Sequence, residues 1–188
     1  MKRIILIHGW SDSPKEPVHI WLAEKLKQKG FKVLVPLMPN PEAPEIEPWV
    51  NHLSKIVSKL DSQTNFIGHS IGCQTILRYL EKQKTKAGKV VLIAPWMHLD
   101  EETIKEEEDA EEIAKSWMET PINFDKVKQN ASSFICIFSD DDPYVPLTDA
   151  KLFEKELNAK TIIEHHKGHF TSGDGVTTNE TALKEFKN

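Results

Sequence analysis

The sequence predicts an α/β protein, a three-layer α/β/α sandwich with a doubly wound, mostly parallel six-stranded sheet. Short apolar runs recur along the chain at residues 4–7, 33–35, 65–67, 90–93, 134–138 and 161–163. These runs do not alternate with polar residues, as expected for strands that are covered on both faces. Segments with helical spacing separate the runs, and strands that alternate with helices form parallel sheets with right-handed crossovers.

The predicted helices are defined by apolar residues three or four positions apart. Their inward-facing residues are, in chain order, Val18, Trp21, Leu22 and Leu26; Trp49, Leu53, Ile56, Val57 and Leu60; Ile76, Leu77 and Leu80; Ala150, Phe153 and Leu157; and Leu183 with Phe186. Gly30 follows the first helix as a stop signal, and Pro48 is expected at the first position of the second. Ligands of such sheets bind beyond the carboxyl ends of the strands, so the residues after each run are the functional candidates.

The chain of 188 residues has the length of one domain. We expect a single domain over residues 1–188, with a helical acidic insertion at about residues 98–130 that crosses the strand ends. The insertion contains the acidic run at residues 106–109 and the pair Glu111 and Glu112. Charges of this kind usually form a solvated helix face.

Composition argues against several classes of partner. The net charge of -5 speaks against an extended phosphate-binding face and hence against nucleic acid. No apolar stretch approaches the length of a membrane span, and the run at residues 4–7 is too short for a signal peptide. Cys73 and Cys136 are expected to be buried reduced thiols rather than a disulfide framework. We therefore expect a cytoplasmic protein that does not associate with membranes.

The clearest motif is Gly68-His69-Ser70-Ile71-Gly72, which lies between an apolar run and a helical pattern. A serine hydroxyl is a weak nucleophile at neutral pH, so it must be exposed and held beside a base. A tight strand-to-helix turn lifts the serine above the sheet, and flanking glycines allow its close packing. The pentapeptide alone would be better explained by a Gly-rich turn with a capping serine. Its position between strand and helix favours Ser70 as a nucleophile.

The acid of a catalytic triad is expected after the run at residues 134–138. Three aspartates compete for this role: Asp140, Asp141 and Asp142. Asp142 is preferred because residues 143–146 form a stiff turn behind it. At least two of the three aspartates should be ordinary members of an acidic loop. The acid would orient the imidazole of the base and stabilise its protonated form.

The general base is expected after the last apolar run, where His169 follows Gly168. Gly168 would let the loop turn so that His169 points inward. His165 and His166, in the same loop, are expected to face solvent or to pack. His69 lies within the strand-to-helix turn at residues 68–72, which we call the serine elbow. It is expected to point away from the nucleophile and to be structural.

A tetrahedral intermediate needs two N–H donors aimed at its oxyanion. We assign them to the amides of Ile71, directly after the nucleophile, and of Trp10, where Gly9 permits a close backbone approach. Trp96 and Met97, together with Trp10, flank predicted strand ends and are candidates to line an apolar substrate pocket. Plain core packing explains the tryptophans about equally well.

These motifs together resemble the small α/β hydrolases related to retinoblastoma-binding protein 9 and the bacterial YdeN protein. The resemblance covers essentially the whole chain and rests on His8-Gly9-Trp10, the serine elbow, Ala94-Pro95-Trp96, Asp142-Pro143-Tyr144-Val145-Pro146 and Gly168-His169-Phe170. It implies a minimal α/β-hydrolase fold with strand order 2-1-3-4-5-6 and the triad Ser70, Asp142 and His169. We expect a serine hydrolase that cleaves ester or thioester bonds of a small acyl substrate through an acyl-enzyme on Ser70, without a cofactor.

Two other function classes were weighed against this one. A non-catalytic or weakly catalytic protein-binding module is possible on a hydrolase scaffold, since fold and motif do not guarantee turnover. No protein partner can be named from the sequence. A metal site from His165, His166, His169 and Asp174 has looser spacing than zinc sites usually show, so no metal is expected.

Overall fold

The computed structural model describes residues 2–105 and 110–187. Its strands form one six-stranded parallel sheet in the order β2-β1-β3-β4-β5-β6. The strands are β1 (Arg3–Ile7), β2 (Lys32–Leu34), β3 (Thr64–His69), β4 (Ala87–Ile93), β5 (Ala131–Ser139) and β6 (Lys160–Glu164). Each strand overlaps one of the apolar runs, so the predicted fold class and strand order are confirmed.

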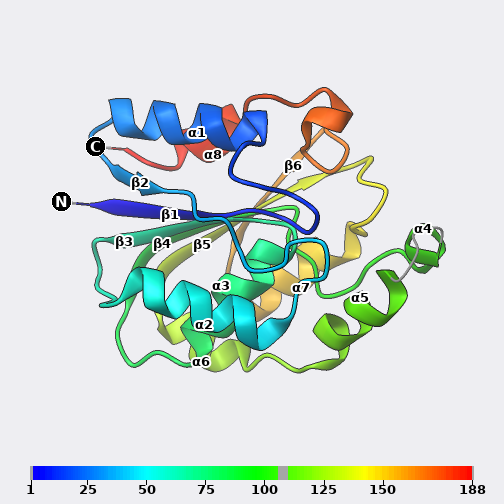
Figure 1. Ribbon diagram of the computed structural model, residues 1–188, viewed down its shortest axis with the longest axis horizontal. Coiled ribbons are helices and arrows are strands. Elements are labelled where there is room, and N and C mark those ends of the chain that lie inside the picture. The colour runs from blue at the N-terminus through cyan, green and yellow to red at the C-terminus, as the bar shows by residue number, and fades with distance from the viewer. Residues whose placement is uncertain (1, 106–109, 188) are drawn as a thin grey trace.

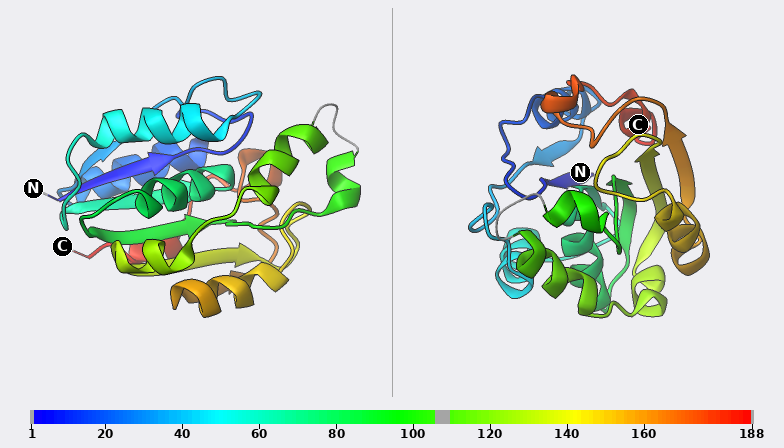
Figure 2. Two further views of the ribbon diagram at one scale, coloured as in Figure 1. Left: turned by 90° about the horizontal axis from the view of Figure 1, so that it is seen from below. Right: turned by 90° about the vertical axis from the view of Figure 1, so that its right-hand side faces the viewer.

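Helices cover both faces of the sheet and complete the three layers (Figures 1 and 2). One face carries α1 (Pro17–Gln28) and α8 (Glu180–Lys184), and the other carries α2 (Ile46–Val57), α3 (Ile71–Glu81), α6 (Phe124–Gln129) and α7 (Thr148–Leu157). Pro48 is the third residue of α2 rather than the first, because the helix begins earlier than expected. The N–H groups of a first helical turn have no partner within the helix, so the proline ring is tolerated there.

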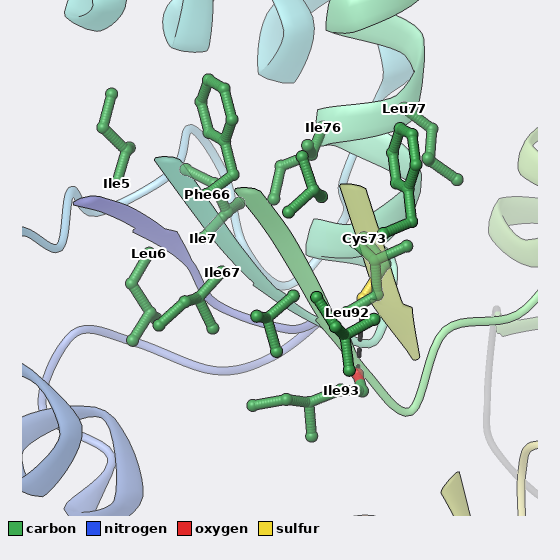
Figure 3. Close-up of a cluster of buried hydrophobic side chains, with 14 of the residues drawn as sticks. Ile5, Leu6, Ile7, Phe66, Ile67, Cys73, Ile76, Leu77, Leu92 and Ile93 are labelled. Atoms are coloured by element: carbon green, nitrogen blue, oxygen red, sulfur yellow. Dashed lines mark hydrogen bonds between the residues drawn. The ribbon is translucent and has the colours of Figure 1, made fainter. Parts of the chain in front are cut away.

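The core between the sheet and α3 is built from the strand residues that the apolar runs predict (Figure 3). Ile5, Phe66 and Leu92 of the central strands are fully buried, as are Ile76 and Leu77 of α3. Burial of one such side chain contributes roughly 1.5–3 kcal/mol. This core fixes the start of α3, and with it the serine elbow, against the end of β3.

Short helices occupy the segment between β4 and β5. They are α4 (Glu101–Lys105), α5 (Ala110–Glu119) and α6. The acidic run at residues 106–109 lies outside the described residues. The first two helices stand beyond the carboxyl ends of the strands, at the right in Figure 1. None of the helices in the described part of the chain is both long and apolar enough to span a bilayer.

The end of α5 is held to α3 by the buried side chain of Arg78. Its Nη2 donates to the carbonyl oxygens of Trp117 and Thr120, both at 2.8 Å. Burial lowers the pKa of Arg78 to about 10. The indole nitrogen of Trp117 donates in turn to the carbonyl of Pro44, at 2.9 Å. These contacts fasten the inserted helices to the body of the domain.

The end of α8 and the residues after it are held by two lysines: Lys29, which follows α1, and Lys160, the first residue of β6. Lys29 Nζ donates to the carbonyl oxygens of Leu183 and Phe186, and Lys160 Nζ lies 2.6 Å from a carboxylate oxygen of Glu185. Both ends of the chain lie where the strands begin, at the left in Figure 1. The two ends are therefore on the opposite side of the molecule from the strand ends.

Candidate active site

Ser70 lies in the tight turn between β3 and α3. Its backbone has φ 51° and ψ -123°, a conformation that residues other than glycine seldom adopt. The Ser70 N–H donates to the carbonyl of Ile93 at 2.9 Å, which ties the turn to β4. A strained strand-to-helix turn of this kind presents a serine at the top of the sheet.

The glycines of the pentapeptide are required by close backbone contacts. A Cβ atom on Gly68 would lie 2.8 Å from the backbone of Cys73, and one on Gly72 would lie 2.4 Å from the carbonyl oxygen of Ile7. Both distances are far below a van der Waals contact. The spacing of the motif therefore follows from the packing of the start of α3 against the ends of β1 and β3.

His169 and Asp142 form a close pair. His169 Nδ1 lies 2.8 Å from Asp142 Oδ2 and 3.1 Å from Oδ1. The buried carboxylate also accepts the N–H groups of Tyr144 and Val145. Because an ionised carboxylate only accepts, the hydrogen of a neutral His169 ring is on Nδ1, and Nε2 is left with a lone pair. The ring is thus set up to accept a proton at Nε2.

The three neighbouring aspartates have different contacts. Asp140 pairs with His165, and this hydrogen bond is the main cause that lowers its pKa. Asp141 accepts from the Ser139 hydroxyl and from the N–H groups of the loop after β6, which lowers its pKa. Of the three, Asp142 is the one with a described contact to His169. Asp142, which the sequence favours because of the proline turn behind it, therefore stays the candidate acid, and its contact with the His169 ring supports that choice.

The main chain of His169 is held on both sides. Its N–H donates to Asp174 Oδ2 at 3.0 Å. Its carbonyl oxygen accepts a hydrogen bond from His69 Nε2 at 2.8 Å, and the two rings lie 5.0 Å apart. The sequence predicts a structural role for His69, but gives no sign that this residue contacts the loop of the base.

Ser70 and His169 open into one cavity of about 400 Å³. The cavity is lined by Trp10, Ser11, Ser70, Trp96, Leu99, Ile104, Ala110, Pro143, Tyr144, His169, Thr171, Gly173 and Asp174. These residues come from the chain after β1, β3, β4, β5 and β6. The volume falls in the range of small-molecule sites. The site therefore lies where the topology of the sheet predicts it.

The candidate pocket residues differ in position. Trp96 is buried in the cavity wall, and its Nε1 donates to Ser70 Oγ at 3.4 Å. Met97 is not among the residues that line the cavity. Its half-buried side chain packs against the hydrophobic core, and its N–H donates to Asp149 Oδ2 at 2.6 Å. Met97, which the sequence suggests as a pocket residue, is therefore not part of this cavity wall. Sequence analysis missed Leu99 and Tyr144, since loop residues have no periodicity that shows where they point.

The two candidate oxyanion donors come from the start of α3 and from the loop after β1. Ile71 is the first residue of α3, and the N–H groups of a first turn have no acceptor within the helix. Trp10 lines the cavity and follows Gly9, whose N–H donates to Asp12 Oδ2 at 3.2 Å. His8 braces the same loop, since its Nε2 accepts the N–H of Met38.

A largely buried cluster of possible cation ligands includes Asp12, from the loop after β1. Asp12, His19 and His69 each place a possible ligand atom within 4.8 Å of the others. Burial would raise the pKa of Asp12, but contacts with the two histidines and with the N–H of Ser13 lower it to about 2. Burial lowers the pKa of His19 to about 4. His19 Nδ1 also lies 3.3 Å from the carbonyl of Ser13, which gives this nitrogen a partner other than an ion.

The residues of the looser candidate metal site in the last loop have separate partners. His165 pairs with Asp140, His169 pairs with Asp142, and Asp174 accepts the N–H of His169. The other cluster of possible ligands in the described chain consists of Asp140, Asp141 and His166, all exposed.

Comparison with known proteins gives the family. The serine hydrolase family model matches residues 4–188. The YdeN protein of Bacillus subtilis is 26% identical over 179 residues, which cover 94% of this chain and 90% of that protein. Its crystal structure aligns with a TM-score of 0.89 over 98% of this chain and 96% of that one.

Two further relatives agree. The serine hydrolase RBBP9 of Rattus norvegicus is 26% identical over 167 residues, 88% of this chain and 80% of that protein. Est1E of Butyrivibrio proteoclasticus, solved with ferulic acid, has a TM-score of 0.73 at 19% identity over 99% of this chain and 88% of that one, a likeness of fold. With a family match over nearly its whole length, the chain belongs to the serine hydrolase family and is an enzyme of that family.

Proposed function

We propose that the enzyme hydrolyses small esters or thioesters through an acyl-enzyme on Ser70. The Ser70 oxygen attacks the carbonyl carbon while His169 Nε2 takes the hydroxyl proton. The proton then passes to the leaving alcohol or thiol as the bond to it breaks. Water, deprotonated by the same nitrogen, then attacks the acyl-enzyme. As the bond to Ser70 breaks, His169 Nε2 returns that proton to the serine oxygen, and the acid is released.

The observation that carries this proposal is the His169–Asp142 pair, whose histidine lines the same cavity as Ser70. Asp142 fixes the ring so that Nε2 is the basic nitrogen, and it would stabilise the imidazolium that forms in each step. The buried carboxylate needs no proton transfer of its own. Ser70, Asp142 and His169 are therefore the proposed catalytic triad.

The amides of Ile71 and Trp10 are the proposed oxyanion donors. Ile71 is the first residue of α3, directly after Ser70, and Trp10 lines the cavity in the loop after β1. Donors of this kind stabilise the charge that develops on the carbonyl oxygen in the transition state. Main-chain donors also need no reorganisation when the charge develops.

The substrate is proposed to be a small molecule with an apolar acyl group. Much of the cavity wall is apolar, and its volume of about 400 Å³ accommodates a short chain or one ring. Because Est1E binds ferulic acid on a similar fold, aryl esters belong in the substrate screen. The free buried thiols of Cys73 and Cys136 support the proposed cytoplasmic location. A binding module without catalysis is not favoured.

Labelling with a fluorophosphonate tests the proposal. The wild-type enzyme should be labelled on Ser70, as located by peptide mass spectrometry, and Ser70→Ala and His169→Ala should lose the label. Ser132→Ala, an exposed serine of β5, is the matched control and should label like wild type. Folded wild-type protein that stays unlabelled would contradict the proposal, as would a label on another serine.

A further inference from the structure

A second histidine of the site, His69, connects two loops that the proposed mechanism needs. It is buried between the loop after β1 and the loop after β6. Its Nε2 lies 2.8 Å from the carbonyl oxygen of His169. A carbonyl cannot donate, so His69 Nε2 must carry a hydrogen. The backbone of the proposed base is therefore held by a side chain from the elbow of the proposed nucleophile.

The other ring nitrogen of His69 faces a carboxylate. His69 Nδ1 is buried, makes no hydrogen bond among the described residues and lies 3.6 Å from Asp12 Oδ2. The same oxygen accepts the N–H of Gly9, and the other carboxylate oxygen accepts the N–H of Ser13 at 2.5 Å. Asp12 is thus fixed by the loop that carries the amide of Trp10. From that position its negative charge faces the Nδ1 edge of the His69 ring.

Three side chains together determine where His169 stands. Asp142 holds its ring, Asp174 holds its N–H, and His69 holds its carbonyl oxygen. The contact with Asp142 sets the tautomer of the ring. The contacts with Asp174 and His69 fix the backbone of the loop at His169. Without His69, the carbonyl would have to find another donor, and the loop would be free to move away from the elbow.

We propose that His69, oriented by Asp12, is a positioning residue that joins the loop of the base to the loop of an oxyanion donor. This inference rests on the proposed function, since it assigns His169 the role of base. In the proposed triad, the carboxylate accepts the Nδ1 hydrogen of the histidine. Asp12 can accept the same hydrogen from His69 only when both ring nitrogens carry one, since Nε2 donates to the carbonyl of His169.

Ordinary core packing is the competing explanation, and it predicts a different result. A histidine that only fills space would lower the melting temperature when replaced, and the folded fraction would keep its kcat. A positioning residue would lower kcat in fully folded protein and leave KM nearly unchanged. A displacement of about 1 Å in a reacting group costs on the order of a hundredfold in rate.

The test compares His69→Gln with His69→Asn. The glutamine amide nitrogen reaches about as far as the ring Nε2 and can still donate to the carbonyl of His169, whereas the asparagine amide is too short. We expect His69→Asn to lose kcat by about a hundredfold at unchanged KM for an ester substrate. His69→Gln should recover most of that loss. His52→Asn, a half-buried histidine of α2, is the matched control and should keep wild-type kcat.

Two further measurements keep the inference falsifiable if the His69 variants fold poorly. Asp12→Asn keeps the His69 side chain but removes the carboxylate beside its Nδ1, and it should lower kcat, though less than His69→Asn. Long-range ¹H–¹⁵N spectra of the wild-type histidines should show a hydrogen on His69 Nε2. A bare Nε2, equal kcat in His69→Asn and wild type, or equal losses in the Gln and Asn variants would overturn the inference. Failure of wild type to label at Ser70 would instead overturn the proposed function.

Discussion

The indole nitrogen of Trp96 donates to the hydroxyl oxygen of Ser70 at 3.4 Å. An indole N–H can only donate, so the serine oxygen is the acceptor in this contact. The hydroxyl hydrogen of Ser70 is therefore left for another partner, which in the proposed mechanism is His169 Nε2. Trp96 thus combines a place in the cavity wall with a direct contact to the proposed nucleophile.

Replacement of Asp142 by asparagine should nearly abolish turnover. An asparagine amide can donate to His169 Nδ1 and would favour the wrong tautomer, so we expect kcat to fall on the order of 10³- to 10⁴-fold. Steady-state ester hydrolysis measures the effect. Asp140→Asn removes an exposed carboxylate that pairs with His165 and should change kcat less than about twofold. Equal losses in the two variants would refute the assignment of Asp142.

The wall of the cavity should control acyl-chain preference. Leu99 lines the cavity and Met97 does not, although they are two residues apart. Leu99→Ala should raise kcat/KM for longer acyl chains relative to acetyl by about tenfold, since one methylene in a pocket is worth about that much. Met97→Ala should leave the ratio unchanged. Rates across a series of p-nitrophenyl esters give both values, and a shift in Met97→Ala alone would reverse the assignment.

The elbow should not tolerate a side chain at Gly72. A Cβ there would lie 2.4 Å from the carbonyl oxygen of Ile7, which is backbone and cannot move aside. We expect Gly72→Ala to lower the free energy of unfolding by about 3 kcal/mol, measured by urea denaturation. Gly173→Ala meets its nearest atom at 3.4 Å and should change stability by less than about 0.5 kcal/mol. A stable Gly72→Ala protein would contradict the tight packing of the turn.

Stability should fall as the pH is lowered from 7 toward 4. The pKa of buried His19 is about 4 in the folded protein, against an ordinary value of 6.5. Between these values the unfolded chain binds a proton that the folded protein does not, so acidification favours unfolding. The contribution of His19 is complete above pH 6.5 and is lost as the pH approaches 4, with a total of about 3 kcal/mol. The lowered pKa of His8 acts in the same direction.

Urea denaturation at pH 4.5 and pH 7 measures this dependence. His19→Gln should flatten it markedly, even if the variant is less stable at both pH values. His52→Gln should retain the wild-type dependence. Asp12, with a pKa of about 2, changes its charge below this range and does not complicate the comparison. A wild-type dependence in His19→Gln would show that another group carries it.

The strands could be predicted from sequence because each one contains a short, largely apolar run between helical patterns. Helices cover both faces of the sheet, so residues such as Ile5 and Phe66 are fully buried. Burial therefore requires apolar residues on both sides of the central strands. Ser70 could be located because its turn needs glycines at fixed spacing. These are local requirements, and a local requirement leaves a mark on neighbouring residues.

Contacts between distant segments could not be predicted in the same way. The N–H of Met97 donates to the carboxylate of Asp149, which lies 52 residues further along the chain. His69 meets the carbonyl of His169 at a separation of 100 residues. The residues near Met97 and His69 in the sequence specify neither partner. An N–H group can donate to any carboxylate or carbonyl oxygen that the fold brings close to it.

Both ends of the chain lie on the side of the molecule where the strands begin, opposite the cavity, and two lysines hold the chain after the last helix. A resin, a sensor surface or a fused carrier protein attached through either end would therefore face away from incoming substrate. An immobilised preparation should turn over at the rate of the free enzyme, whichever end carries the linker.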